Sequence, residues 1–333
     1  MPKAIFFLGK GGVGKTTCAA HAALALADGG RRVLVVSLDP AHNLGDVLDL
    51  PLRDRPVQVA PRLEAMEVDV EGRIRRYLHR AADRFQGVYR YLRVFNVDRS
   101  LDLLRYAPGV EEEAILDALR ELLLAGGGDG YEVVVVDTPP TGLTLRVLGL
   151  PRVSLLWLDR LIGLRARILD LRGMVAHVQG ERVFQVEGER LALPHRAADD
   201  PVLAELHRVW EETKALEGLL TDVGQTAVAV VLTPESLPLL ETLRTLGALE
   251  RFGMPASTLI VNKVWTGQGT PAPDPLVAAQ QAEILGRLRR QVGLPVLEAA
   301  LEPTEVRGLQ RLRAFTCPAG RHFAAWVSGE AVR

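Results

Sequence analysis

The sequence predicts an α/β fold: a doubly wound, mostly parallel sheet with a helical subdomain formed by insertions. Five short apolar runs, most of them rich in β-branched residues, alternate with helical stretches along the chain. These runs are continuous rather than interrupted by polar residues, which is typical of strands covered on both faces. Strands that alternate with helices favour parallel pairing. The predicted strands are residues 4–8, 33–36, 132–137, 227–232 and 257–261.

Helical periodicity occupies most of the chain between these runs. Residues 15–28 are rich in Ala and Leu and predict a helix directly after the first strand. Residues 71–125 and 152–222 have no clear strand, apart from a patch at 181–193 that could form a hairpin. We interpret them as one helical subdomain at an edge of the sheet. The chain, 1–333, is then a single domain whose core, the sheet with the helices that cover it, spans about 1–70, 126–151 and 223–316.

Composition excludes several classes of protein. The 333 residues are 48% hydrophobic and 24% charged, with a formal net charge of −1, which is ordinary for a globular chain and excludes a fibrous or disordered one. Near-neutral charge argues against a nucleic-acid coat, and we expect no nucleic-acid partner. Because the sequence has no signal peptide and no apolar run of membrane-spanning length, we expect a cytoplasmic protein. Cys18 and Cys317 are far apart in the sequence, so we expect neither a disulfide framework nor zinc.

Residues 9–16 read Gly-Lys-Gly-Gly-Val-Gly-Lys-Thr, between the first predicted strand and the first predicted helix. This is the phosphate-binding pattern G-x-x-x-x-G-K-[ST] in the context that supports it. Its glycines let backbone N–H groups surround a phosphate at a helix N-terminus. Lys15 would reach the β- and γ-phosphates of a nucleotide, and the Thr16 hydroxyl would bind Mg²⁺. The candidate nucleotide-binding residues here are Gly11, Gly12, Val13, Gly14, Lys15, Thr16 and Thr17.

Lys10 is a second lysine in this loop. The chain has only five lysines, so a lysine at this position has a specific reason. The run from Lys10 to Thr17 resembles the deviant Walker A loop of the signature-lysine P-loop NTPases, which include partition, septum-site, nitrogenase-iron and arsenite-pump proteins. The resemblance implies a face-to-face homodimer in which Lys10 reaches the nucleotide of the facing subunit. An exposed lysine without that role is the alternative.

Two further segments follow predicted strands, where ligands bind in open α/β sheets. Residues 39–46 begin with Asp39, and residues 137–145 begin with Asp137. A carboxylate in such a place can hold Mg²⁺, usually through water, or orient the attacking water. Taken alone, either aspartate could instead cap a helix or form a turn.

These segments are similar to switch I and switch II of the arsenite-pump (ArsA), or anion-transporting, ATPase family, which includes ATPases that target tail-anchored membrane proteins. The resemblance is collinear from about residue 3 to residue 316. It also includes residues 108–112, 234–242, 261–263 and 305–309. It implies that Asp39 positions or activates water and that Asp137 is linked to Mg²⁺ through water. It further implies that Asn43 and Asp46 belong to switch I, that Asn262 binds adenine and that Pro303 or a neighbour walls the base. The candidate catalytic residues are therefore Asp39, Lys10 and Lys15.

The resemblance implies a Mg²⁺-dependent, homodimeric ATPase whose opening and closing captures or targets a hydrophobic, tail-anchored-like membrane protein. An efflux motor for arsenite or antimonite is the alternative, and a partition or septum-site switch is less favoured. Residues 155–174 are the candidate client surface, with a stripe at Leu155, Leu158, Ile162 and Leu169 that core packing explains equally well. The arginine-rich residues 73–106 favour a solvated helix face over an anion-binding site.

Overall fold

A computed structural model gives the structure of the chain. It describes residues 2–41, 43–88, 105–125, 130–179, 183–186, 189–192, 194–267 and 273–330. The chain forms two compact units. The first comprises Met1–Arg73, Ile115–Leu148 and Leu219–Arg333, and the second comprises Ile74–Ala114 and Gly149–Gly218. The sequence predicted a nucleotide-binding core and a helical subdomain. This assignment of the chain to two parts stays a prediction.

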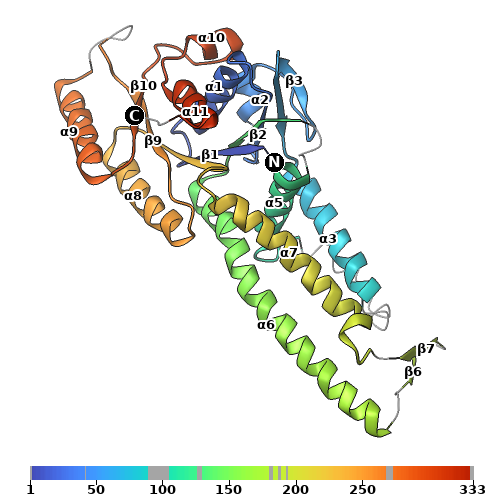
Figure 1. Ribbon diagram of the computed structural model, residues 1–333. Coiled ribbons are helices and arrows are strands. Elements are labelled where there is room, and N and C mark those ends of the chain that lie inside the picture. Colours follow the sequence, from blue (N-terminus) through green and yellow to red (C-terminus); the bar gives the residue numbers. More distant parts are fainter. Residues whose placement is uncertain are drawn as a thin grey trace. The chain divides into compact units, whose positions relative to one another are not determined.

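The first unit is built on a sheet that has eight strands among the described residues, in the order β10-β9-β8-β1-β5-β2-β4-β3 (Figure 1). All neighbours pair in parallel except β3 and β4, which are antiparallel. The carboxyl ends of the parallel strands therefore meet at one edge of the sheet. The strands are β1 (Lys3–Gly9), β2 (Val33–Ser37), β3 (Val57–Ala60), β4 (Leu63–Glu67), β5 (Val133–Asp137), β8 (Thr226–Leu232), β9 (Thr258–Val264) and β10 (Val296–Ala300).

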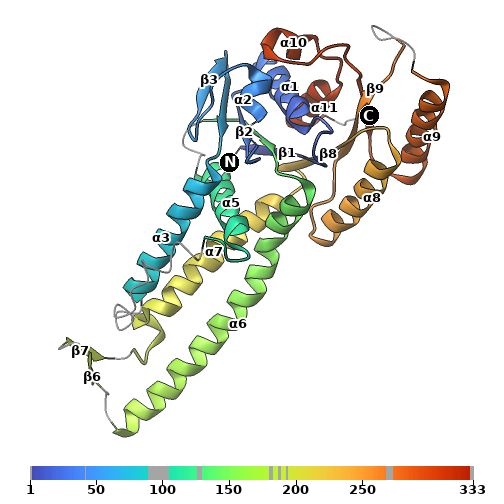
Figure 2. The same cartoon turned by 180° about the vertical axis from the view of Figure 1, so that it is seen from behind.

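Helices cover both faces of this sheet, so the central strands are buried throughout (Figures 1 and 2). On one face, α1 (Lys15–Asp28), α10 (Gly308–Ala314) and α11 (Ala319–Ser328) share a hydrophobic core with alternate residues of β1. The rings of Phe7 and Phe323 meet edge to face there, 5.6 Å apart. The opposite face carries α8 (Ser236–Arg251). This unit also contains α2 (Asn43–Leu48), α9 (Pro275–Gln291), the π-helical turn η2 (Glu121–Ala125) and residues 115–120 of α5 (Val110–Arg120).

The five predicted strands and the predicted parallel sheet are confirmed, as is the helix at residues 15–28. Three strands were not predicted: β3, β4 and β10. Each is short and lies at or beside an edge of the sheet, and β4 and β10 contain Glu and Ala, which are poor strand formers. Helix α11 was not predicted either. It buries Phe323 in the core and is not a basic surface helix.

The two cysteines lie next to each other, although the sequence separates them by almost the whole chain. Cys18 lies on α1, and Cys317 immediately precedes α11; both are free thiols. A hydrogen bond between the two thiols, together with burial, raises the pKa of Cys18 well above its usual value. The same contact and the N–H group of Ala319 lower the pKa of Cys317. The two residues, far apart in the sequence, are brought together because α11 packs against α1.

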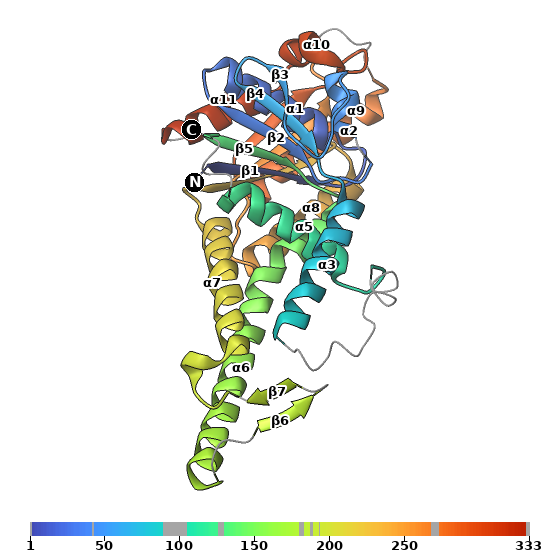
Figure 3. The same ribbon diagram turned by 90° about the vertical axis from the view of Figure 1, so that its right-hand side faces the viewer.

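Among its described residues, the second unit contains most of three helices and the first five residues of a fourth, which begins at Val110 (Figure 3). Its helices belong to α3 (Val70–Val88), α5 (Val110–Arg120), α6 (Thr141–Gln179) and α7 (Pro201–Thr221). The hairpin predicted within residues 181–193 is confirmed as β6 (Val183–Val186) paired antiparallel with β7 (Glu189–Ala192), and the turn η4 (Ala197–Asp199) follows. The prediction of helices is confirmed at residues 71–88, 110–125, 152–179 and 201–221, whereas residues 105–109 form turns. Residues 89–104 lie outside the described parts. No helix of the described residues is both long and apolar enough to cross a membrane.

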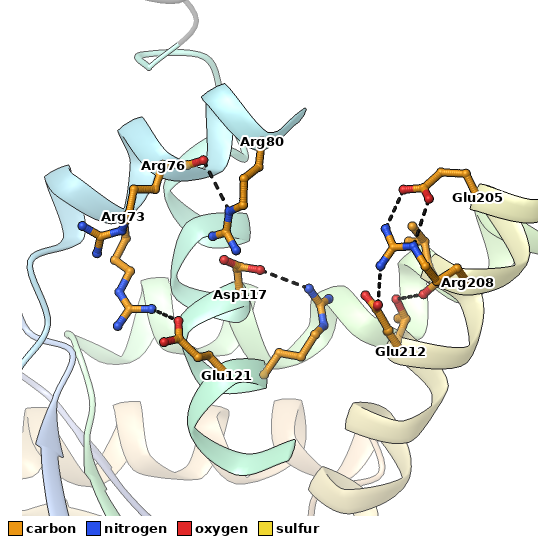
Figure 4. A network of polar contacts seen from close by, with 11 residues as sticks. Arg73, Arg76, Arg80, Asp117, Glu121, Glu205, Arg208 and Glu212 are labelled. Carbon is orange, nitrogen blue, oxygen red and sulfur yellow. Dashed lines mark hydrogen bonds and ion pairs between the residues drawn. The ribbon is translucent and has the colours of Figure 1, made fainter. Parts of the chain in front are cut away.

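Ion pairs join α6 to the start of α7. Arg165 makes a two-pronged contact with Asp200, at 3.1 Å and 2.6 Å, and the N–H of Leu203 donates to the same carboxylate. Burial favours the neutral acid, but these partners hold the pKa of Asp200 below its usual value. Farther along α7, Arg208 pairs with Glu205 and Glu212 (Figure 4). The Arg165 contact therefore joins the two helices, whereas the Arg208 contacts lie within α7.

Arg73, the first arginine of the arginine-rich stretch, belongs to the first unit. It is buried and pairs with Asp54, at 3.1 Å. It also pairs with Glu121 (Figure 4). Its pKa is raised because these pairs and hydrogen bonds outweigh burial, which alone would lower it. Arg73 thus forms ion pairs in the interior of the first unit and is not part of a solvated helix face. Arg75, Arg76 and Arg80 also have polar interactions of their own.

The apolar stripe predicted on residues 155–174 faces inward. Leu158 and Leu169 are buried, so core packing, the alternative interpretation, is confirmed for these two residues. A different stripe of α6 is exposed in its place. It consists of Trp157, Leu161, Leu164, Leu171, Val175 and Val178, which are 44–80% exposed, and we call it the α6 stripe.

Candidate functional site

The loop between β1 and α1 has the conformation expected of a phosphate loop. Gly12 and Gly14 have positive φ angles, 81° and 91°, which glycine adopts without the steric cost of a side chain. Gly14 precedes the first residue of α1, Lys15, so the free N–H groups of the helix start open into the loop. The predicted strand, loop and helix are all present here, and together they create a place for an anion.

Lys15 and Thr16 begin α1 and point to different partners. Lys15 is buried, and its Nζ donates to the carbonyl oxygen of Lys10 across the loop, at 3.4 Å. The Thr16 hydroxyl donates to Oδ2 of Asp137, at 2.8 Å. Because Asp137 ends β5, the neighbour of β1, this bond links the loop to the carboxyl end of the next strand. The ammonium of Lys15 thus joins the two ends of the loop.

Asp137 is fully buried beneath the loop. Its Oδ2 accepts hydrogen bonds from Thr16 and, at 3.3 Å, from Ser37. Its Oδ1 has no hydrogen-bond partner among the described residues. Burial raises the pKa of Asp137 to about 7, with a smaller contribution from the negative charge of Asp39, although the hydrogen bonds and Lys15 oppose the shift.

The polar groups around Asp137 suit a divalent cation. A hydroxyl and a carboxylate are the hard oxygen donors that Mg²⁺ prefers, and the carboxylate retains one oxygen without a partner. A cation nearby would also favour the charged form of a carboxyl group whose pKa burial raises. Thr16 and Asp137 therefore fit the predicted Mg²⁺ site, the aspartate directly or through water.

Asp39 follows β2 and is held in a tight turn. Its N–H donates to the Ser37 hydroxyl, and its Oδ1 accepts the N–H of Ala41, at 3.1 Å. The same Ser37 hydroxyl donates to Asp137, so the two aspartates lie on either side of one side chain. Asn43 begins α2 and is exposed. The two strand-end aspartates predicted from the sequence therefore come together.

A cavity of about 750 Å³ opens at this edge of the sheet. The predicted residues that line it are Gly11, Gly12, Gly14, Lys15, Thr16, Thr17, Asp39, Asn43 and Asn262, and Pro303 also lines it. The sequence predicted no individual role for Val47, Lys263 or Phe315, and for residues 300–306 it predicted only that Pro303 or a neighbour walls the base. Residues 300–306 follow the unpredicted edge strand β10, and Phe315 follows α10, so no local pattern pointed to them. Such a cavity is of the size that binds a nucleotide-sized ligand.

Asn262 and Lys263 end β9 beside the loop. The Asn262 amide donates from Nδ2 to the carbonyl of Val13, at 2.9 Å, and its Oδ1 accepts the N–H of Lys263. Lys263 donates from Nζ to the carbonyl of Gly12, at 3.1 Å. Both side chains thus hold the phosphate loop, whereas the sequence predicted only an adenine contact, for Asn262.

Lys10 projects from the loop to α8. Its Nζ forms an exposed ion pair with Glu241 of the same chain, at 3.2 Å. An exposed pair of this kind contributes about 1 kcal/mol or less and is easily exchanged for another partner. The predicted role of Lys10, toward the nucleotide of a facing subunit, stays a prediction.

Gly14→Ala is expected to lower the free energy of unfolding by about 2–5 kcal/mol. Alanine would have to adopt a left-handed backbone conformation, and its Cβ would overlap with a neighbouring side chain. A Cβ at this position would lie 2.2 Å from Nδ2 of Asn262. Gly30→Ala is the matched control: its φ is 93°, but its Cβ would meet open space. Thermal unfolding of both variants measures the difference. If both variants lost the same stability, the Cβ at position 14 would not be in steric conflict with Asn262.

Comparison with known proteins places these features in a family. The family model described as "Anion-transporting ATPase" matches residues 2–317. The chain is 30% identical to "ATPase ARSA2" of Chlamydomonas reinhardtii, over 94% of this chain and 83% of that protein. It is 30% identical to "ATPase GET3A" of Arabidopsis thaliana, over 94% and 82%. It is 29% identical to "Putative arsenical pump-driving ATPase 1" of Aquifex aeolicus, over 92% and 76%. The chain therefore belongs to the anion-transporting ATPase family and is an ATPase.

Proposed function

We propose that ATP binds in the 750 Å³ cavity, with its phosphates in the loop at residues 9–16 and its base toward Asn262 and residues 300–306. The observation that carries this proposal is the joint lining of one cavity by the phosphate loop, Asp39 and the end of β9. Phosphoryl transfer requires charge neutralisation and alignment more than covalent chemistry. The lysines and backbone N–H groups of the loop can neutralise charge, and Asp39 can align a water molecule.

Each polar group then has a distinct task. Lys15 exchanges the Lys10 carbonyl for phosphate oxygens, and the loop N–H groups stabilise the same oxygens. Thr16 and Asp137 hold Mg²⁺, which neutralises charge that develops on the phosphates. Asp39, fixed by the Ser37 and Ala41 contacts, orients the attacking water.

We propose a homodimer in which Lys10 leaves Glu241 and reaches the nucleotide of the facing subunit. The ion pair that it gives up is exposed and weak, so the exchange costs little. Hydrolysis then removes the phosphate that both aspartate segments contact. Helix α6 starts at Thr141, directly after residues 137–140, so a shift of that segment reaches α6 along the chain.

The α6 stripe supports capture of a hydrophobic helical client. Trp157, Leu164, Leu171 and Val178 are seven residues apart, and Leu161 and Val175 lie between them on the same face. A seven-residue apolar repeat is the pattern with which one helix packs along another. The side chains of Trp157 and Leu171 are 60% and 63% exposed, so the α6 stripe presents apolar surface that does not pack in the core. We propose that the α6 stripe binds a single apolar helix, such as a membrane-protein tail.

Capture of a co-expressed apolar C-terminal helix tests this proposal. The Asp39→Asn protein, given ATP and Mg²⁺, is expected to co-purify with that helix, and Leu164→Glu or Leu171→Glu in the same background is expected to abolish capture. Arg167→Glu, also exposed on α6, is the matched control and is expected to retain it. Capture unaffected by both leucine variants would refute the α6 stripe as the client site. No capture in any of them would refute the client function.

An efflux motor for arsenite is the second candidate, because several relatives carry "arsenical pump-driving" in their names. The adjacent thiols of Cys18 and Cys317 are soft ligands of the kind that As(III) prefers, but the chain has only these two cysteines. Arsenite-stimulated hydrolysis that is lost in Cys317→Ser would favour this candidate over client capture. A cytoplasmic location, no zinc and no nucleic-acid partner stay predictions.

A further inference from the structure

Two consecutive residues at the end of β9 hold two consecutive carbonyls of the phosphate loop. Lys263 Nζ donates to the Gly12 carbonyl at 3.1 Å, and Asn262 Nδ2 donates to the Val13 carbonyl at 2.9 Å. The Asn262 amide is itself fixed, because its oxygen accepts the N–H of Lys263 at 2.8 Å. The two side chains therefore act on the loop as one unit.

The planarity of the peptide bond gives these contacts a consequence for the loop. All peptide bonds of the described residues are trans, so each C=O points opposite to the N–H of the same peptide unit. With the Gly12 and Val13 carbonyls turned toward β9, the N–H groups of Val13 and Gly14 point to the other face of the loop. These are donors of the kind that a phosphate requires. Lys263 and Asn262 thus fix the direction of two anion-binding groups without touching the anion.

The backbone of Lys263 adopts an unfavourable conformation at this position. Its φ is 59°, in the left-handed region that residues other than glycine rarely adopt. Its side chain lies in an exposed position at the cavity, so burial does not explain the conformation. Lysine is also scarce: of five in the chain, Lys10, Lys15 and Lys263 all contact or belong to this loop. Strain of this kind persists where the surroundings impose it, often at functional sites.

We propose that Lys263 is a positioning residue of the nucleotide site: its ammonium holds the phosphate loop in the anion-receiving conformation before a nucleotide arrives. The inference rests on the proposed nucleotide site. A loop that is already ordered does not lose conformational entropy on binding, so the contact strengthens binding of every ligand that carries phosphates. Once phosphates occupy the loop they hold it themselves, so the contact matters less for the bound complex.

Lys263→Ala is therefore expected to raise the Kd for ATP and for ADP about tenfold, the effect of losing one hydrogen bond from a charged donor. The kcat is expected to change less than about threefold, since the bound phosphates then order the loop. The affinity for adenosine, which has no phosphate, is expected to stay unchanged. Lys263→Arg retains a cationic donor and is expected to recover most of the ATP affinity. Nucleotide competition titrations and steady-state kinetics provide these readouts.

Two glycine variants separate loop positioning from backbone strain. Lys263→Gly removes the ammonium and relieves the left-handed strain, so ATP affinity is expected to fall as in Lys263→Ala while Tm does not fall. Arg62→Gly is the matched control, because Arg62 is also left-handed, with φ 63°, but lies at a different cavity from the loop. Its ATP affinity is expected to equal that of the wild type.

The outcomes distinguish this inference from the nucleotide site on which it rests. Wild-type protein that binds no ATP would overturn both. Wild-type affinity for ATP in Lys263→Ala would overturn the positioning role and leave the site intact. A fall in kcat equal to the loss of affinity, or equal weakening of adenosine and ATP, would assign Lys263 a different role from the one proposed here.

Discussion

Asp39→Asn is expected to bind ATP with nearly wild-type affinity and to hydrolyse it about 100- to 10 000-fold more slowly, the range lost with a single positioned acid–base group. Asparagine has the same shape, and its side-chain oxygen can still accept the N–H of Ala41, so the turn after β2 is retained. The amide cannot accept a proton from water. Removal of one negative charge near Asp137 also favours the ionised form of that buried carboxyl, which supports cation binding.

Single-turnover hydrolysis and a separate ATP titration measure the two parts of this prediction. Asp170→Asn, an exposed aspartate of α6, controls for the loss of one negative charge and is expected to behave as the wild type. Normal turnover by Asp39→Asn would mean that another group orients the water. Loss of ATP affinity together with turnover would place Asp39 in binding rather than in catalysis.

Lys15→Ala is expected to weaken ATP binding about 100-fold or more, because in the proposed site the ammonium makes charge-assisted contacts with several phosphate oxygens. The loop also loses the bond from Lys15 to the Lys10 carbonyl, which joins its two ends. A planar guanidinium has a different shape and donor geometry from a compact ammonium, so Lys15→Arg is expected to restore little.

Isothermal titration with ATP and ADP tests this prediction. Lys214→Ala is the matched control, since Lys214 lies against the Trp210 ring in the second unit, and its ATP affinity is expected to be unchanged. A Lys15→Ala protein that binds ATP normally would show that the phosphates lie outside the loop at residues 9–16, and the proposed site would then be wrong.

The sequence predicted the parts of the fold that local physics determines. The central strands are continuous apolar runs, because both of their faces are buried, and such runs are visible without a structure. Strands β3, β4 and β10 lie near the sheet edges, where partial exposure permits mixed polarity; their residues carry little local preference. Helix α11 was missed for a related reason, since only its packing on α1 explains its short apolar face.

In the candidate site, too, features encoded in one segment were predictable and contacts between distant segments were not. The phosphate loop is one contiguous segment, and parallel topology brings Asp39 and Asp137 to the same sheet edge, so both were predictable. The contacts of Lys263 with Gly12 and of Cys18 with Cys317 join residues that are about as far apart as the chain allows. No spacing rule connects such pairs. Likewise, the helical period identified an apolar α6 but could not decide which of its faces is exposed.

The packing of α11 on α1 has a consequence for how the protein is made. The core beside the phosphate loop is complete only when Phe323 lies against Phe7, and 316 positions separate these two residues in the sequence. At about 5–20 residues per second, roughly 15 to 60 s separate the appearance of these two residues on the ribosome. We therefore expect the nascent chain to acquire ATP affinity only after Phe323 has been synthesised. Until then the hydrophobic face of β1 and α1 that α11 covers stays exposed.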